Sequence, residues 1–449
     1  MYKPYKMPVC KASPDVKISE PRISKPVLFL IKILSRPYLI FLFGFAKVIL
    51  RKDKILFDAF KRSLSGESRL LIAYRHPDGR EPQLLAWFFI FRLKALAAKC
   101  GIKFARKPHA IFIYGYEVAR WGGPFARFFM PNIGAIPIHH TKMDSKGMGR
   151  IYNAITDGPY PVTLAPEGQV SYTTDSVPRL ENGVVRIGFQ AAGLLNEEKQ
   201  DCPVEILPLS IHFRYDSFGE KAMKKLLEKT EKICSFKHEK NVFQERLKRC
   251  RDHILEKNEN RYNIKPDESL LFEQRLAHVV DAALETAEKM LGIKGEGDFF
   301  MRLYKVRQDC WDRIFLPDIE KLDCMTDVER GIADIKAGEA WHIARHQELA
   351  DFAWYFRCPV PAEDSELHVK VEYVQNLWDF ANRTMGGAIT NRVNINPGKV
   401  FIQAAPPINL SCRLSNYKED KKGAVNALVS ELEKAYIDCI TDVNRNVPG

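Results

Sequence analysis

Hydrophobic positions follow two different patterns along the chain, and the change from one to the other falls near Asp216. Before this point, short apolar runs with a β-type pattern alternate with runs of helical periodicity. The runs expected to form strands are 70–74, 110–114, 133–138, 160–165 and 204–213, and those expected to form helices are 82–99, 117–130 and 183–195. Continuous apolar strands between helices are typical of a sheet covered on both faces. The pattern therefore predicts an α/β fold with a mixed sheet flanked by helices.

Residues 216–396 carry amphipathic helical patterns instead, and no strand pattern of comparable strength occurs there. A strand-and-loop pattern at 398–410 and a helical pattern at 419–440 then follow. We predict one α/β domain, built from 65–215 and 397–449, that is interrupted by a large helical insertion.

Residues 1–64 form a basic and apolar N-terminal segment. They contain 14 Lys or Arg against 4 Asp or Glu, which accounts for 10 of the net charge of +12. The apolar stretch within it, 25–54, is interrupted by Lys32, Arg36 and Pro37, whereas a membrane-spanning helix needs about 20 consecutive apolar residues. We expect two short helices that lie in a membrane interface, with a buried core hairpin as the alternative.

This segment and the cysteine pattern limit the classes of partner. A basic segment can bind nucleic acid, but the chain has neither arginines interleaved with aromatic residues nor the pattern of a nucleic-acid-binding module. Ten cysteines are scattered without a CxxC pair, which suits a reducing compartment and argues against a zinc site. We therefore expect a membrane-associated protein on the cytoplasmic face, with no nucleic-acid partner.

Two polar turns follow two of the expected strands. His76 comes just after 70–74, and the sequence Pro-Glu-Gly at 166–168 comes just after 160–165. Ligands bind at the carboxyl edge of an open α/β sheet, so the two turns can share a site. Glu81 can orient the imidazole of His76, which is then able to take a proton from an alcohol. The amides around the glycine of the second turn can face an oxyanion.

The wider pattern bears on how this His-plus-acid pair is interpreted. Taken alone, such a pair in a turn is more often structural than catalytic. There is no GxSxG nucleophile elbow, which favours direct transfer to an alcohol over a covalent acyl-enzyme.

Four blocks, in order, resemble those of the glycerolipid acyltransferases, the family that includes glycerol-3-phosphate and lysophosphatidate acyltransferases. The matching blocks are HPDGRE (76–81), GAIPIHH (134–140), PEGQV (166–170) and VEILPLSI (204–211). The last strand and helix of the family resemble 399–440.

The resemblance implies that His76 is the catalytic base and that Glu81, in the place of the family's aspartate, is its orienter. It also implies that His140 and four residues of the second turn bind the acceptor. These four are Pro166, Glu167, Gly168 and Gln169. For Glu167, positioning the turn is an equal alternative.

The implied reaction moves a fatty acyl group from acyl-CoA or acyl carrier protein to the hydroxyl of a lysophospholipid or related lipid acceptor, in phospholipid synthesis or remodelling. The donor is a co-substrate, so neither a bound cofactor nor a metal is implied. The alternative is a catalytically weak relative that binds lipid or acts as a membrane scaffold.

The chain departs from the family at three basic positions. His140 stands for the arginine of the second block, Gln169-Val170 for the Thr-Arg after the glycine turn, and Glu181 for a lysine. Phosphate monoesters need several charge-assisted donors, which these residues supply poorly. We therefore expect an acceptor whose head group is neutral, zwitterionic or a phosphodiester.

Two further interpretations rest on spacing and composition. His342 and His346 lie one helical turn apart, but no third ligand stands in a fixed relation to them, so we predict no metal site. An acyl chain needs an apolar slot, which helix 82–99 with Phe125, Phe128 and Phe129 can line.

Overall fold

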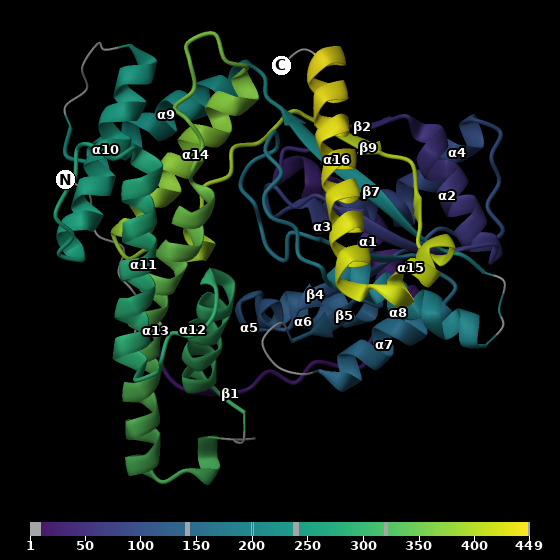
Figure 1. Ribbon diagram of the computed structural model, residues 1–449, viewed down its shortest axis with the longest axis horizontal. Coiled ribbons are helices and arrows are strands. Elements are labelled where there is room, and N and C mark those ends of the chain that lie inside the picture. Colours follow the sequence, from purple (N-terminus) through teal and green to yellow (C-terminus); the bar gives the residue numbers. More distant parts are fainter. Residues whose placement is uncertain are drawn as a thin grey trace. The chain divides into compact units, whose positions relative to one another are not determined.

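The computed structural model describes residues 10–139, 144–198, 200, 202–236, 242–317 and 322–447. These residues form two compact units (Figure 1). The sheet unit comprises Ile18–Asp216 and the described residues from Asn396 onward. The helical unit comprises the described residues up to Lys17 together with Ser217–Ile395. The change of hydrophobic pattern at Asp216 is therefore also the end of the first part of the sheet unit.

The sheet unit contains an eight-stranded mixed sheet flanked by helices, as the alternating pattern predicts. Its strands are β2 (Lys47–Arg51), β3 (Arg69–Tyr74), β4 (Ile111–Gly115), β5 (Ile136–Ile138), β6 (Val162–Leu164), β7 (Val204–Arg214), β9 (Lys399–Ala404) and β10 (Ile408–Asn409). The order is β2-β9-β7-β3-β6-β4-β5, and β10 pairs with β7. Neighbouring strands are parallel except where β7 meets β9 and β10, which are antiparallel to it.

The central strand β3 is parallel to both of its neighbours. Leu71 pairs with Val162 of β6 on one side and with Ile206 of β7 on the other. Helices cover both faces, so successive side chains of β3 are buried and the strand is continuously apolar. β6 pairs with β3 up to Leu164, which brings the carboxyl ends of these two strands to the same edge.

The crossovers place helices on opposite faces of the sheet. Connections β3 to β4 and β4 to β5 run one way along the strand order, whereas β5 to β6 and β6 to β7 run the other way. Right-handed crossovers therefore put the helices of the first two connections on one face and those of the last two on the other. The first group is α3 (Glu81–Trp87), α4 (Leu93–Lys99), α5 (Glu117–Trp121) and α6 (Gly123–Asn132), and the second is α7 (Ser145–Thr156) and α8 (Gly183–Glu197).

The helix after the last strands completes the second of these layers. α15 (Leu414–Glu419) and α16 (Lys421–Asn446) share a hydrophobic core with α7 and α8, and α16 lies across β7 (Figure 1). The hydroxyl of Tyr436 donates a 2.8 Å hydrogen bond to the carbonyl oxygen of Ala73 in β3. The segment that follows the insertion is therefore bonded directly to the central strand.

Helix 82–99 is continuous, but its middle is π-helical. Phe88–Arg92 forms a π-helical stretch between α3 and α4. Its fully buried Phe89 contacts Phe60 of α2 (Asp53–Ser65) and Phe112 of β4, with ring centroids 5.1 and 6.5 Å apart. This helix therefore fills the core on the first face of the sheet.

The N-terminal segment differs from the expected pair of interfacial helices. Where the pair was expected, one helix, α1 (Lys25–Phe41), contains Pro37. The edge strand β2, parallel to β9, follows it before α2 begins. β2 has only three apolar residues in a row, and so short a run reads equally well as strand or helix, so the pattern alone does not reveal an edge strand. α1 buries only Leu39, which leaves the alternative of a buried core hairpin unsupported.

None of the helices in the described part of the chain combines the length and apolar character that crossing a membrane requires.

The helical unit is built from six long helices. They are α9 (Ser217–Ile233), α10 (Phe243–Arg261), α11 (Phe272–Leu291), α12 (Phe299–Ile314), α13 (Asp327–Tyr355) and α14 (Leu367–Thr384). Buried alanines, including Ala287, Ala337 and Ala340, let α11 and α13 pack closely. A two-residue ladder between β1 (Ser13–Pro14) and β8 (Phe315–Leu316) ties the residues before the sheet unit to this unit. The helical insertion predicted from periodicity therefore also includes residues from near the N-terminus.

Candidate active site

His76 lies in a tight turn between β3 and α3. The N–H of Arg75 still bonds to the carbonyl of Leu209, 2.9 Å away, so the turn starts directly after the last ladder bond of β3. Gly79 has a φ of +101°, a conformation that favours glycine. The chain then enters α3 at Glu81. The glycine allows the chain to reverse within a few residues, which a regular helix through 76–81 would not.

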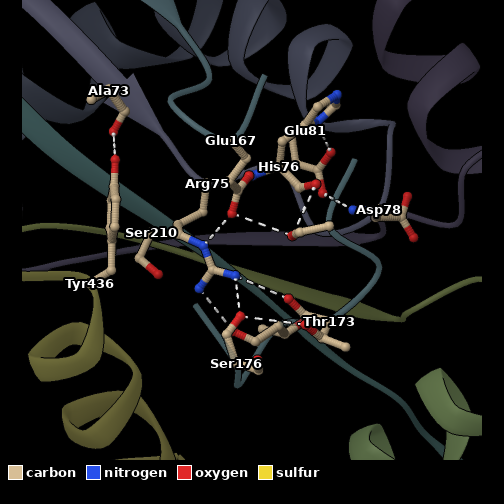
Figure 2. Close-up of polar contacts among 12 residues, drawn as sticks. Ala73, Arg75, His76, Asp78, Glu81, Glu167, Thr173, Ser176, Ser210 and Tyr436 are labelled. Atoms are coloured by element: carbon tan, nitrogen blue, oxygen red, sulfur yellow. Dashed lines mark hydrogen bonds and ion pairs between the residues drawn. The ribbon is translucent and has the colours of Figure 1, made fainter. Parts of the chain in front are cut away.

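Glu81 folds back over this turn and contacts His76. Its Oε2 lies 2.8 Å from Nδ1 of His76, and its two oxygens accept hydrogen bonds from the N–H groups of Asp78 and Gly79, at 2.7 and 2.8 Å (Figure 2). The Glu81 side chain is fully buried, whereas that of His76 is 15% exposed. An ionised carboxylate only accepts, so Nδ1 carries the hydrogen and Nε2 of the neutral ring is left to accept a proton.

Glu167 ties the second turn to the first. Its Oε1 accepts a 2.6 Å hydrogen bond from Nε of Arg75, and its Oε2 accepts one from the backbone N–H of His76 (Figure 2). Both members of the Arg75–Glu167 ion pair are buried, with side chains 1% and 0% exposed. Of the two roles expected for Glu167, these contacts support positioning of the turn.

The other nitrogens of Arg75 bond to a loop after the second turn. They donate to the carbonyl oxygens of Thr173, Thr174 and Ser176, at 3.0, 3.2 and 2.8 Å. Ser171 in the same loop donates from its N–H to the carbonyl of His76, at 2.9 Å. Sequence reasoning missed Arg75, although a charged residue at the end of an apolar strand, beside a candidate histidine, was an available signal.

A further ion pair holds the outer side of the His76 turn. Arg80 pairs with Asp78, and its NH2 group lies 2.8 Å from Oδ2 of that residue. Arg80 also donates to the carbonyl of Phe43, at 3.2 Å, and to the side chain of Asn396, at 3.4 Å. The turn is therefore fastened to the loop after α1 and to the segment that leads into β9.

In the Pro-Glu-Gly turn, the glycine N–H is hydrogen-bonded to the start of the same turn. Gly168 has a φ of +72°, and its N–H bonds to the carbonyl of Ala165 at 3.2 Å. This N–H is therefore engaged within the turn, and the oxyanion role expected of the amides around it stays a prediction. A Cβ at this position would lie 2.5 Å from Oε1 of Glu181, and the N–H of Glu181 bonds to the carbonyl of Pro166 at 2.6 Å. Glu181 is thus packed against the turn.

The remaining sequence-predicted residues have different outcomes. Gln169 is half-buried in the second turn, next to Gly168, whereas His140 lies outside the described residues. Phe125 and Phe128 are exposed, and the apolar side of helix 82–99 belongs to the core, so these groups do not line a common slot.

The two histidines considered for a metal belong to the helical unit. Nδ1 of His346 lies 2.8 Å from the hydroxyl oxygen of Tyr262, so this ring has a protein partner. Within the described ranges, no group of three side chains is arranged to hold a metal ion.

The charges around His76 act on its proton affinity. Burial alone would lower the pKa of His76, but the hydrogen bond to Glu81 and the negative charges of Glu81, Glu167 and Asp78 raise it above the ordinary value. Burial and then the same two glutamates raise the pKa of the neighbouring Tyr74, which stays neutral. His76 is thus a stronger base than a free histidine and binds its proton up to a higher pH.

No protein-family model matches this chain, and a search of curated proteins finds no match either. The function is therefore argued from the geometry and chemistry of the site.

We predict that Glu167→Gln destabilises the fold far more than a control substitution in a partly exposed ion pair. The substitution leaves the charge of Arg75 buried and unpaired, which costs about 3–5 kcal/mol in the free energy of unfolding. The control is Glu205→Gln, because Glu205 pairs with the partly exposed Arg62 and its loss costs at most about 1 kcal/mol. Equilibrium urea unfolding measures both. Equal losses would contradict the positioning role of Glu167.

We also predict that His76 titrates above the ordinary histidine pKa of about 6.5. Its folded pKa is raised, so protonated His76 stabilises the fold below pH 6.5, and this contribution is lost as the pH rises through the folded pKa. Side-chain NMR of the histidines measures the titration, and His76→Ala assigns the resonance. Glu81→Gln should lower this pKa, whereas Glu205→Gln should leave it unchanged. A His76 pKa below 6.5 in the native protein is the outcome that opposes this account.

Proposed function

We propose that the protein transfers a fatty acyl group from a thioester donor, acyl-CoA or acyl carrier protein, to the hydroxyl of a lipid acceptor at a membrane surface. The proposal rests mainly on one observation, the 2.8 Å contact between His76 and a fully buried carboxylate at the carboxyl edge of the sheet. The resemblance of four sequence blocks to the glycerolipid acyltransferases supports the same reaction.

The chemistry follows from the protonation states of the pair. Nε2 of neutral His76 takes the proton from the acceptor hydroxyl while the oxygen attacks the thioester carbonyl. A C–O bond forms, and when the tetrahedral intermediate collapses the C–S bond breaks. The imidazolium then returns the proton to the departing thiolate, so His76 ends the cycle neutral. The carboxylate of Glu81 stabilises the imidazolium, to which its Oε2 is hydrogen-bonded.

The exposed surface of α1 supports a lipid acceptor. Phe29, Ile33 and Phe41 are exposed, and so are Lys25 and Lys32 of the same helix. A helix with exposed apolar side chains and lysines suits the interface between lipid head groups and acyl chains. An enzyme held there meets acceptors that are themselves part of the bilayer.

The alternative is a lipid-binding protein that retains the fold but not the activity. The specific observation in its favour is Glu181, an acidic residue packed against Gly168 where the resembling family has a lysine. Against it, the His76 turn has both members of the pair in place and both glutamates hydrogen-bonded.

We predict that His76→Ala lowers acyl transfer by roughly 10²- to 10⁴-fold without unfolding the protein, because it removes the general base. Purified protein is incubated with labelled acyl-CoA or acyl carrier protein and a panel of lysolipid and simple alcohol acceptors, and acylated product is measured. Circular dichroism checks the fold. His212→Ala does not serve as a control because this histidine is fully buried, whereas the exposed His342→Ala does. Near-native turnover by a folded His76→Ala protein would rule out the proposed base.

A second prediction concerns the acceptor. Val170 offers no side-chain donor, and Glu181 would repel a phosphate monoester by about 1 kcal/mol or more. A lysolipid with a neutral, zwitterionic or phosphodiester head should therefore outcompete lysophosphatidate at equal concentration. The ratio of the two acylated products in one reaction measures this preference. A clear preference for lysophosphatidate means that other basic residues bind the phosphate.

A further inference from the structure

A second apolar surface lies outside the N-terminal segment. Trp121 of α5 and Phe125 and Phe128 of α6 are 51%, 63% and 52% exposed. We call these three side chains the aromatic patch. Beneath them, the half-buried ring of Phe129 contacts Phe125 and Phe128, with centroids 4.2 and 5.1 Å apart. Two of the three side chains of the patch are thus supported by a third phenylalanine ring.

Backbone hydrogen bonds join the end of α6 to the residues just before α1. Where the chain approaches α1, the N–H of Arg22 bonds to the carbonyl of Pro131 at 2.8 Å, and that of Ser24 bonds to the carbonyl of Asn132 at 2.9 Å. Ile23 also forms a β-bridge with Ile133. The end of α6 therefore meets the start of α1, and the two apolar surfaces belong to neighbouring parts of one unit.

α1 also shares a face of the sheet with α5 and α6. The guanidinium of Arg36 lies 5.1 Å from the ring of Trp87 in α3, and α3 is on the same face as α5 and α6. Beyond α1, the carbonyl of Phe43 accepts a hydrogen bond from Arg80 in the His76 turn. α1 therefore lies between the end of α6 and the loop that contacts the His76 turn.

The charge of this region favours a lipid surface over a second copy of the chain. Residues 21–52 contain seven Lys or Arg and no Asp or Glu, and 118–139 likewise contain no acidic residue. Two copies that met through this region would bring like charges together, whereas a bilayer with anionic lipids offers the opposite charge. Tryptophan and phenylalanine are also the side chains that favour the interfacial layer of a membrane.

We propose that the aromatic patch and the exposed apolar side chains of α1 form one membrane-docking surface, and that the patch inserts into the lipid interface beside α1. The inference deepens the proposed function, because it sets the His76 turn near the plane where a lysolipid hydroxyl lies. Its test measures binding alone and needs no turnover.

Vesicle flotation with paired variants tests the two halves of the surface. The patch variant is Phe125→Ser/Phe128→Ser, the α1 variant is Phe29→Ser/Ile33→Ser, and the control is Phe218→Ser, which changes an exposed phenylalanine of α9. Point variants replace a deletion of 1–64, because that deletion would remove β2 and most of α2 from the fold. Vesicles are made of phosphatidylcholine or of an equimolar mixture with phosphatidylglycerol.

The patch variant should lower the partition constant by at least roughly tenfold on both kinds of vesicle, since each phenylalanine buries a large apolar surface. Its loss should persist at high salt, which screens only the contribution of the lysines. The α1 variant should lose binding similarly, and the control should match the native protein. A patch variant that floats as well as the native protein would overturn the proposal.

Trp121 gives a local readout of the same contact. Brominated lipids should quench part of the tryptophan fluorescence of vesicle-bound native protein, and Trp121→Phe should remove that part. Unchanged quenching in Trp121→Phe would also overturn the proposal. If the patch variant instead dissociates a dimer in sedimentation while vesicle binding survives, the patch belongs to a second copy and the proposal fails.

The binding experiment can fail or succeed independently of the acyl-transfer experiment that tests the proposed function. A patch variant that acylates a dispersed short-chain acceptor at the native rate, yet no longer floats, supports docking by the patch and leaves the His76 chemistry intact. A native protein that floats but transfers no acyl group would refute the proposed function and leave the docking surface standing.

Discussion

The buried ion pair between Arg75 and Glu167 is the interaction on which the candidate site depends. Placing two charges in the interior is costly unless their hydrogen-bonding groups are satisfied. Here, Arg75 donates to a carboxylate and to three carbonyl oxygens, and Glu167 also accepts from the backbone of His76. The pair therefore fixes the conformation of three irregular segments. They are the His76 turn, the Pro-Glu-Gly turn and the loop at 171–176.

The order of dependence runs from the sheet to the His76–Glu81 pair. Parallel pairing of β3 with β6 brings two turns to one edge, and Glu167 fastens one turn to the other. With the backbone of His76 held, the side chain of Glu81 completes the turn by accepting two amide hydrogen bonds and the contact with Nδ1. A histidine positioned in this way needs no further reorganisation before it accepts a proton.

The last helix supports the same arrangement from the other face of the sheet. Tyr436 bonds to the carbonyl of Ala73, and its ring centroid lies 5.9 Å from the guanidinium of Arg75 (Figure 2). Burial, with the charge of Glu167, keeps the pKa of Tyr436 well above its usual range, so its hydroxyl stays a neutral donor. This contact gives a physical reason for the chain to return to the sheet unit after a long insertion.

Much of the fold could be predicted because a strand that is buried on both faces is apolar at successive positions. Residues 70–74 of β3 read as a continuous apolar run, and His76 and Glu81 were found because a stiff polar turn interrupts such a pattern. β2 was missed because an edge strand of five residues, inside an apolar stretch, has no periodicity of its own. The role of Arg75 was missed because its partners are carbonyls of an irregular loop about 100 positions away, which no local pattern encodes.

The most direct measurement of the central claim is a double-variant cycle on acyl transfer with His76→Ala, Glu81→Gln and the two combined. If Glu81 acts only by orienting and stabilising His76, the combined variant should transfer acyl groups no more slowly than His76→Ala alone, because residues that act as a unit are not additive. Rate losses that multiply in the combined variant would show that the two side chains act independently, and would contradict the account.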